Sequence, residues 1–375
     1  MNADDAVVFD REIGSRLSEE LQTATTSIYS PYRLHLDYVM RQFRESGAYP
    51  KIPSVALVDE CSFNAVAFTD GTRELIGINA GVAIVLPLFF YDLFGRRDVF
   101  PEMGNASVEL AGNGHIDPNL FNATGPTAEC RIGDNWRPVL HVPQDPVRSK
   151  LATLFAMIAW DFILFHEMTH ILRCHIPFME RMLSLPRRPE RLHKLFEFPD
   201  DLASEELKLS RVLECDADFG AARTQVSGWL QNDLRAVSSM FGATIRSWSE
   251  FCYFWQLSIQ LLFQVMAMVD AKNVGDGERS HPHPDVRAYM LMNFISPMWR
   301  KVIPSDAEYA GIAKRAKNEI DHLLERHVLW GSKARMAESY REEFKSEAKA
   351  LGDGILACNQ ELFDLGNKRK AQKDV

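Results

Sequence analysis

The clearest chemical signal in the sequence is the segment His166-Glu167-x-x-His170, in which two histidines bracket a glutamate. On a helix, residues four apart share one face, with their Cβ atoms about 5–6 Å from each other. Two imidazoles placed in this way can reach one metal ion at about 2.0–2.1 Å, the length of a zinc–nitrogen bond. Glu167 lies one step around the helix, where it can accept a proton from a metal-bound water. A core helix with two hydrogen-bonded histidines would show the same short pattern, so the rest of the chain must decide between the two.

A catalytic zinc site needs a third protein ligand and an open position. His175 lies nine residues after His166, on the opposite side of an ideal helix. We therefore expect His175 to stay away from the metal and its substitution to have little effect. Glu214 and Asp218 are four residues apart on one face of a second predicted helix. We assign Glu214 as the third ligand and expect Asp218 to accept a hydrogen bond from a liganding imidazole, which fixes the tautomer of that ring.

Apolar residues at helical spacing surround both candidate ligand segments. The helix that carries the histidines is expected over about residues 151–175, and Pro177 marks its end. Its apolar flanks would bury the two imidazoles and exclude water from the site. The helix that carries Glu214 covers about residues 203–230, and further helices are expected over 8–47, over 81–93 and through the charged last part of the chain.

A small sheet is expected ahead of the first long buried helix. Ser54–Val58 is strand-like, and an Asp-Gly turn at 70–71 joins two further strand-like runs, Ala65–Phe68 and Leu75–Asn79. Residues 95–150 are rich in Asn, Gly, Pro and Asp, which in a compact enzyme indicates a lid, a binding loop or an insertion. We therefore expect an N-terminal helical segment, a catalytic domain interrupted by that insertion, and a charged helical extension, over residues 1–50, 51–300 and 301–375.

One segment raises the question of a membrane. Phe251–Val269 carries no charged residue and is nearly as long as the ~20 residues that span a bilayer. However, Gln256, Gln260 and Gln264 recur every four residues and draw a polar stripe down one face of the helix. Amides that face lipid are costly, whereas amides in a protein core can bond to neighbours. No other stretch is long and charge-free enough to cross with it, so we expect a buried core helix and no membrane span.

Composition narrows the class of protein further. The chain has 375 residues, of which 46% are hydrophobic and 25% charged, as in a globular protein. The net charge of −9 argues against nucleic acid as a partner, because such binding rests on basic contacts to phosphates. The six cysteines are scattered, with no Cys-x-x-Cys pair, which is typical of reduced thiols. The first residues are acidic and lack the basic and apolar regions of a secretory signal, so we expect a cytoplasmic protein.

Four segments, in this order, resemble the gluzincin metallopeptidases of the CAAX prenyl protease and HtpX-like type. The segments bracket about residues 54–292, and four matches in order are more specific than any one of them. They are Phe63–Phe68 with the strand-like run Ile76–Gly81, the histidine motif His166–His170 followed by His175, Glu214-x-x-x-Asp218, and Ser280-His281-Pro282 with Arg287 beyond it. Members of this type carry several clear membrane spans, and this chain is closer to a soluble or divergent branch.

The resemblance implies a fold and a set of roles. It implies an α+β, zincin-like fold that is mostly helical, with a small sheet beside the active-site cleft and an edge strand near Ile76–Ala80 that pairs with an extended substrate. It also implies a zinc endopeptidase in which His281 lies close to the metal and stabilises the oxyanion. Arg287 is expected to pair with a carboxylate of the site such as Asp218.

These observations predict a zinc-dependent peptidase that acts on protein or peptide substrates. Zinc would polarise the scissile carbonyl and its water, while Glu167 would take the proton and return it to the leaving amine. One alternative is a hydrolase of non-peptide amides that uses the same metal site. Another is a non-catalytic interaction or sensor protein with a structural zinc, against which Glu167 argues because a structural site needs no base.

Overall fold

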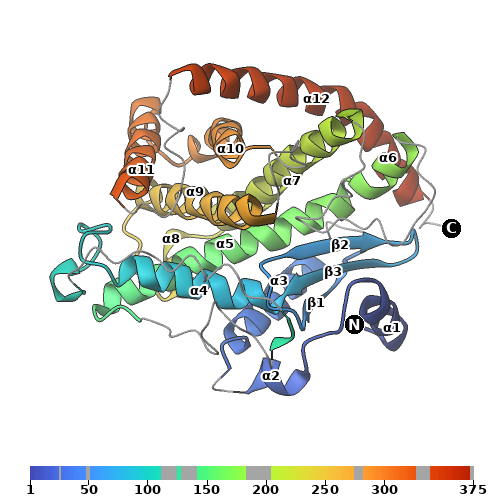
Figure 1. Ribbon diagram of the computed structural model, residues 1–375, viewed down its shortest axis with the longest axis horizontal. Coiled ribbons are helices and arrows are strands. Elements are labelled where there is room, and N and C mark those ends of the chain that lie inside the picture. Colours follow the sequence, from blue (N-terminus) through green and yellow to red (C-terminus); the bar gives the residue numbers. More distant parts are fainter. Residues whose placement is uncertain are drawn as a thin grey trace.

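The computed structural model describes residues 1–24, 27–47, 51–110, 125–127, 142–182, 204–273, 282–326 and 338–371. Helices make up 71% of the structure and are accompanied by one three-stranded sheet, which agrees with the expected α+β class. The sheet lies at one side of the molecule, and the long helices stack beside and above it (Figure 1). The boundaries expected at residues 50 and 300 are not tested by this arrangement. Of the expected insertion, residues 111–124 and 128–141 lie outside the described residues.

The sheet contains the three strands expected from the sequence, β1 (Ser54–Val58), β2 (Ala65–Thr69) and β3 (Glu74–Asn79). Their order is β1-β3-β2, with β1 parallel and β2 antiparallel to β3. The Asp-Gly turn joins β2 to β3, and Gly71 takes the left-handed φ of +86° that this turn requires. Because β3 is the central strand, the expectation of an edge strand near Ile76–Ala80 is wrong. The edges are β1 and β2.

The N-terminal part is divided more finely than the expected helix over residues 8–47. It forms α1 (Ala3–Glu12), α2 (Glu19–Thr23) and α3 (Ser30–Ser46). The chain turns at Gly14, whose φ of +140° is open to glycine alone, and Arg16 then forms a β-bridge with Val58 at the outer edge of β1. The helical spacing of apolar residues over residues 8–47 is thus divided among separate helices and does not mark one continuous helix.

Two apolar helices form the centre of the molecule. The first, α4 (Ala80–Phe94), starts directly after β3, and the second is α5 (Pro146–Leu172), whose N-cap Asp145 accepts a hydrogen bond from the amide of Arg148. The buried guanidinium of Arg148 donates to five backbone carbonyls of residues 94–103 and so fastens that loop, which precedes the short 3₁₀ helix η1 (Ala106–Val108), to the start of α5. Around α5, aromatic rings such as Phe90, Phe94 and Phe155 pack edge to face.

In the sequence, α5 is followed by the short α6 (His175–Met182), then by α7 (Ser204–Leu230) and α8 (Leu234–Phe241). The helix α7 packs along α5. The helices α5 and α7 approach closely at Gly220, where an added Cβ would lie 2.4 Å from the side chain of Thr169. Glycine at this position therefore allows α7 to lie against the end of α5 that carries the two histidines.

The Gln-striped segment lies within α9 (Trp248–Asn273), between α5, α10 (Pro284–Trp299) and α11 (Asp306–Arg326). Among the described residues, two helices are long and apolar enough to cross a membrane by length and composition: α5, 94% of whose most apolar window is buried, and α9, with 83% buried. The expectation that Phe251–Val269 had no possible partner of this kind is therefore wrong. Ser258 in α9 donates a hydrogen bond to the carbonyl of Phe155 in α5, which joins the two helices inside the protein.

The last helix, α12 (Glu338–Ala371), runs across the top of the molecule over α7 and reaches α6 (Figure 1). Gly354 of α12 lies against Val212 of α7, where a Cβ would be 2.6 Å from the valine side chain. The charged C-terminal part is thus packed against the helix that carries Glu214.

Candidate metal centre

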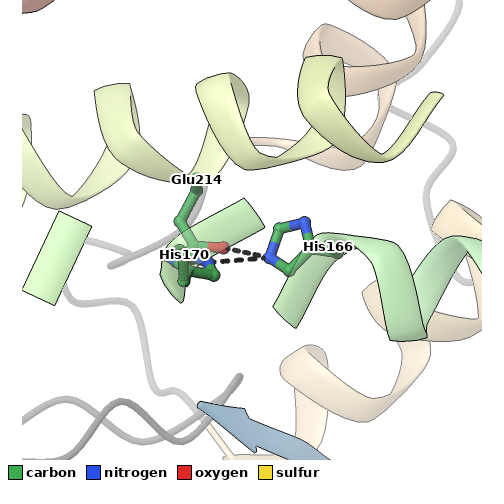
Figure 2. A group of neighbouring side chains, drawn as sticks. All are labelled: His166, His170 and Glu214. Carbon is green, nitrogen blue, oxygen red and sulfur yellow. Dashed lines mark hydrogen bonds and ion pairs between the residues drawn. The ribbon is translucent and has the colours of Figure 1, made fainter. Parts of the chain in front are cut away.

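The last turns of α5 and the middle of α7 bring three candidate ligands together. His166 and His170 project from α5, and Glu214 faces them from α7 (Figure 2). The three side chains are buried, with exposures of 1%, 5% and 4%. One ligand atom from each lies within 4.8 Å of the others. Residues separated by nearly fifty positions in the sequence therefore meet as the sequence pattern required.

The distances within this group fit a small metal ion. The Nε2 atoms of His166 and His170 are 3.1 Å apart, and Nε2 of His166 is 3.1 Å from Oε2 of Glu214. Nε2 of His170 is 3.5 Å from Oε1 of the same carboxylate. For a tetrahedral ion with ligands at ~2.0–2.1 Å, neighbouring ligand atoms should be about 3.3–3.4 Å apart. The two nitrogen–oxygen distances are to different oxygens of Glu214, so it is the two imidazole nitrogens together with the one carboxylate that form an N₂O donor set able to hold a metal ion.

Asp218 and Arg287 stabilise the orientation of His166. Oδ1 of Asp218 lies 3.0 Å from Nδ1 of His166, and Arg287 donates two hydrogen bonds of 2.7 Å to the same carboxylate. Burial alone would raise the pKa of Asp218, but Arg287 and His166 hold it below its ordinary value. Burial opposes the charged form of His166, yet its bonds to Asp218 and Glu214 raise its pKa to about 10. The contacts expected for Asp218 and Arg287 are thus present.

Glu167 is placed beside the ligands and not among them. Its side chain is 1% exposed, and Oε1 has no hydrogen-bond partner among the described residues. Burial, opposed by nearby His166 and reinforced by Glu214, raises the pKa of Glu167 to about 8. A buried carboxyl oxygen without a partner is costly, and such groups are characteristic of functional sites. Glu167 therefore has an oxygen free to receive a proton.

His175 lies where the sequence argument did not place it. The helix α5 ends at Leu172, and Cys174 takes a left-handed φ of +59°, so the ideal-helix geometry stops before His175. Nδ1 of His175 lies 3.1 Å from Nδ1 of His170. The argument that placed His175 on the opposite side of the helix is therefore wrong, but the prediction that His175 is not a ligand agrees with the three-residue group, to which it does not belong.

Asp216 and Arg173 were missed altogether. Asp216 lies 2.8 Å from Nε2 of His175, and Arg173 binds both oxygens of Asp216. Asp216 follows Glu214 by two residues, a spacing that on a regular helix does not share a face. The sequence signal that could have identified Asp216 is the run of acidic residues in α7, where Glu214, Asp216 and Asp218 occupy alternate positions.

His281 lies outside the described residues, so its expected place beside the metal is not tested. The chain resumes at buried Pro282, and His283 caps α10 by accepting a hydrogen bond from the amide of Asp285. Because Arg287 in the first turn of α10 reaches Asp218, that end of α10 does lie at the site.

No protein-family model, curated protein or solved structure matches the chain. The function is therefore argued from the geometry of the site itself.

Proposed function

We propose that the chain is a zinc-dependent peptidase in which His166, His170 and Glu214 hold the metal and Glu167 is the general base. The observation that carries the proposal is the buried group of two imidazoles and one carboxylate, with 3.1 Å between the two Nε2 atoms and 3.1 and 3.5 Å from these nitrogens to the two oxygens of Glu214. Histidine nitrogens with one carboxylate form the donor set of many catalytic zinc sites, which keep one position open. The zincin-like form of the α+β fold belongs to the same proposal.

When bound, zinc would act as a Lewis acid towards the substrate carbonyl and activate water for attack. Glu167 takes a proton from the attacking water at its carboxylate and passes it to the nitrogen of the leaving amine. The pKa of about 8 lies close to neutrality, and a cation beside the carboxylate would lower it. Glu167 is then ionised and ready to accept a proton at neutral pH. His281 remains the proposed group for stabilising the oxyanion.

An extended peptide would bind along β2, because β2 rather than β3 is the sheet edge next to α5 (Figure 1). Edge strands offer unpaired backbone groups that an extended peptide can use. Pairing along the backbone does not require a chain terminus, which favours an endopeptidase. A non-peptide amide hydrolase would use the same metal ligands, and a structural zinc would fill its fourth position with protein and have no use for Glu167.

The test is the metal content and activity of the purified protein. We expect about one zinc per chain and cleavage of denatured protein substrates, both lost in His166→Ala and His170→Ala, because zinc affinity depends on the complete donor set. His322→Ala, which alters an exposed histidine of α11, is the matched control and should retain both. Protein that stays metal-free in zinc-replete, chelator-free buffer would refute the metal site. Zinc-loaded protein that cleaves small amides but no peptide would establish the alternative hydrolase.

A further inference from the structure

A chain of polar side chains, buried from His170 to Asp216, leads from His170 to the C-terminal helix. His170 contacts His175 at 3.1 Å, and His175 contacts Asp216 at 2.8 Å. Arg173 donates to both oxygens of Asp216, at 2.8 and 3.0 Å, and to Oδ1 of Asn359 in α12 at 2.7 Å. His175 is 1% exposed and Asp216 is 7% exposed, so the contact between them is shielded from water, whereas the side chain of Arg173 is 38% exposed.

The direction of these hydrogen bonds follows from the position of the metal site. A histidine binds metal as the neutral ring, and Nε2 of His170 is the nitrogen that faces His166 and Glu214. The proton of His170 is therefore on Nδ1, which donates to Nδ1 of His175. The other nitrogen of His175 then carries its proton and donates to Asp216. The chain of bonds has one consistent direction, from the ligand to a carboxylate.

We propose that His175 and Asp216 are positioning residues for His170, which hold its ring and its tautomer so that Nε2 points at the metal. The inference rests on the metal site proposed above. It gives His170 the same kind of support that His166 receives directly from Asp218. In each case a carboxylate of α7 accepts the hydrogen bond and is itself held by an arginine, Arg173 in one case and Arg287 in the other.

The left-handed turn at Cys174 is what makes the arrangement possible. A φ of +59° is uncommon for a residue with a side chain, because the left-handed region strains the backbone of residues other than glycine. The turn ends α5 and starts α6 with His175, whose ring comes back against His170. A continuous helix would have carried His175 to another face.

The same contacts make α12 part of the metal centre. Arg173 is shared between Asp216 and Asn359, so the position of α12 helps to hold the guanidinium on the carboxylate. The close packing of Gly354 on Val212 fixes α12 against α7 less than one helical turn from Glu214. Loss of the Asn359 contact should therefore be felt at His170 although the two side chains do not touch.

The experiment compares full-length wild type with His175→Phe and His175→Asn. Zinc affinity is measured by competition with a chelator, and the cobalt-substituted proteins are compared by their visible spectra, which report ligand geometry. His175→Phe keeps a ring but has no acceptor, and should weaken zinc binding by roughly 10–100-fold and change the cobalt spectrum. His175→Asn can place its side-chain oxygen near the position of Nδ1, and should recover most of the affinity and the wild-type spectrum.

A second pair of variants on α12 covers the case in which His175→Phe does not fold. Asn359→Ala removes the contact to Arg173, whereas Glu361→Ala removes a neighbouring pair with Arg181 that does not lead to the site. We expect weaker zinc binding in Asn359→Ala alone. Wild-type affinity and spectrum in both His175→Phe and Asn359→Ala would overturn the positioning role while leaving the metal site intact. A wild-type protein that binds no zinc would instead refute the proposed function, and the positioning role with it.

Discussion

Glu167 is the residue whose replacement separates metal binding from hydrolysis. Glu167→Gln keeps the size of the side chain and removes the base, so the protein should bind zinc normally and lose about 10²–10⁴-fold in turnover. Zinc content and peptide cleavage measured on the same preparation check both halves. Near-normal turnover in this variant would remove Glu167 from the mechanism, and lost zinc would make it part of the metal-binding shell.

Replacing only one residue of the buried pair Asp218–Arg287 should lower the free energy of unfolding strongly. Both side chains are buried, with exposures of 1% and 3%, so Asp218→Ala would leave an unpaired guanidinium. Breaking a buried pair in this way typically costs ~3–5 kcal/mol of unfolding free energy. The double variant Asp218→Ala/Arg287→Met should recover part of that stability in denaturant unfolding, but not the zinc affinity. If the double variant is as unstable as the single one, the cost does not come from the uncompensated charge.

At the scale of residues, the sequence predicted the side chains that meet through regular helical spacing. His166 with His170, and Glu214 with Asp218, are pairs four apart on helices that the structure contains, and each pair does share a face. The role of His175 was missed because the left-handed residue Cys174 breaks that regularity. A left-handed backbone conformation at a residue other than glycine is hard to predict from a single sequence. Residues with a side chain rarely adopt this conformation, so the residue type gives no sign of it.

At the scale of elements, the contact between α5 and α7 should be sensitive to one methyl group. Gly220→Ala would place a Cβ 2.4 Å from Thr169, so α7 must shift away from α5. Overpacking of this kind costs ~1–3 kcal/mol, which exceeds the ~0.5–1 kcal/mol that alanine gains over glycine within a helix. We expect a lower melting temperature and weaker zinc binding, because Glu214 moves with α7.

Gly228 provides the matched control on the same helix. An added Cβ at Gly228 meets nothing within 4 Å, so Gly228→Ala should stabilise the protein slightly and leave zinc binding unchanged. Adding Thr169→Ala to Gly220→Ala should restore part of the loss. Equal melting temperatures for the two glycine variants would show that α5 and α7 are not in tight contact at this point.

The ion pair between α3 and α5 predicts a pH dependence of stability. Nε2 of His35 lies 2.6 Å from Oδ1 of Asp161. Burial lowers the pKa of His35, but the Asp161 carboxylate more than offsets this and the net shift is upward. With a folded pKa above the unfolded value of about 6.5, the pair contributes fully below that pH, and the contribution is lost as the pH rises through the folded pKa.

His35→Gln tests this directly, because its amide can still donate to Asp161 but does not titrate. The wild type should exceed the variant in melting temperature at acidic pH, and the difference should shrink as the pH rises. A difference that is constant with pH would mean that His35 is not charged in the folded protein.

The strands and long helices were predictable because their patterns are local. The Asp-Gly turn with its two flanking runs predicts the β2–β3 hairpin, and the apolar run before His166 predicts α5. The order of the sheet was not predictable in this way. The pairing of β1 with β3 is set by contacts between residues 21 apart in the sequence, and the sequence of β3, which has Glu74 and Asn79 at its ends, does not distinguish a central strand from an edge strand.

At the scale of the whole molecule, the apolar helices α5 and α9 can be explained as the centre of one core. The largest buried side chains include Trp160 and Phe155 of α5 and Trp255 of α9, and these helices share a single hydrophobic cluster with the sheet and α4. A chain of this size can bury a core large enough to need two such helices. Apolar length alone therefore does not imply lipid around them.

We expect the protein to be recovered without detergent, with α5 and α9 inside it. Some polar groups of both helices bond within the protein: Gln225 of α7 donates to the carbonyl of Ile158 and accepts from Trp255, and Gln264 of α9 donates to Asp285. Between 83% and 94% of their most apolar windows is already covered by protein, which leaves little apolar surface for lipid. The two ends of α9 must also serve one site, since α7 before it carries Glu214 and α10 after it carries Arg287. A single span by α9 would place those neighbours on opposite faces of a bilayer about 30 Å thick.

Fractionation of cells that express the full chain measures whether the protein is recovered without detergent, with Gln264→Leu as a variant that makes α9 more apolar. Recovery of the wild type only in detergent-extracted membranes would show that α5 and α9 face lipid together. It would contradict the packing of α9 against α5, α10 and α11.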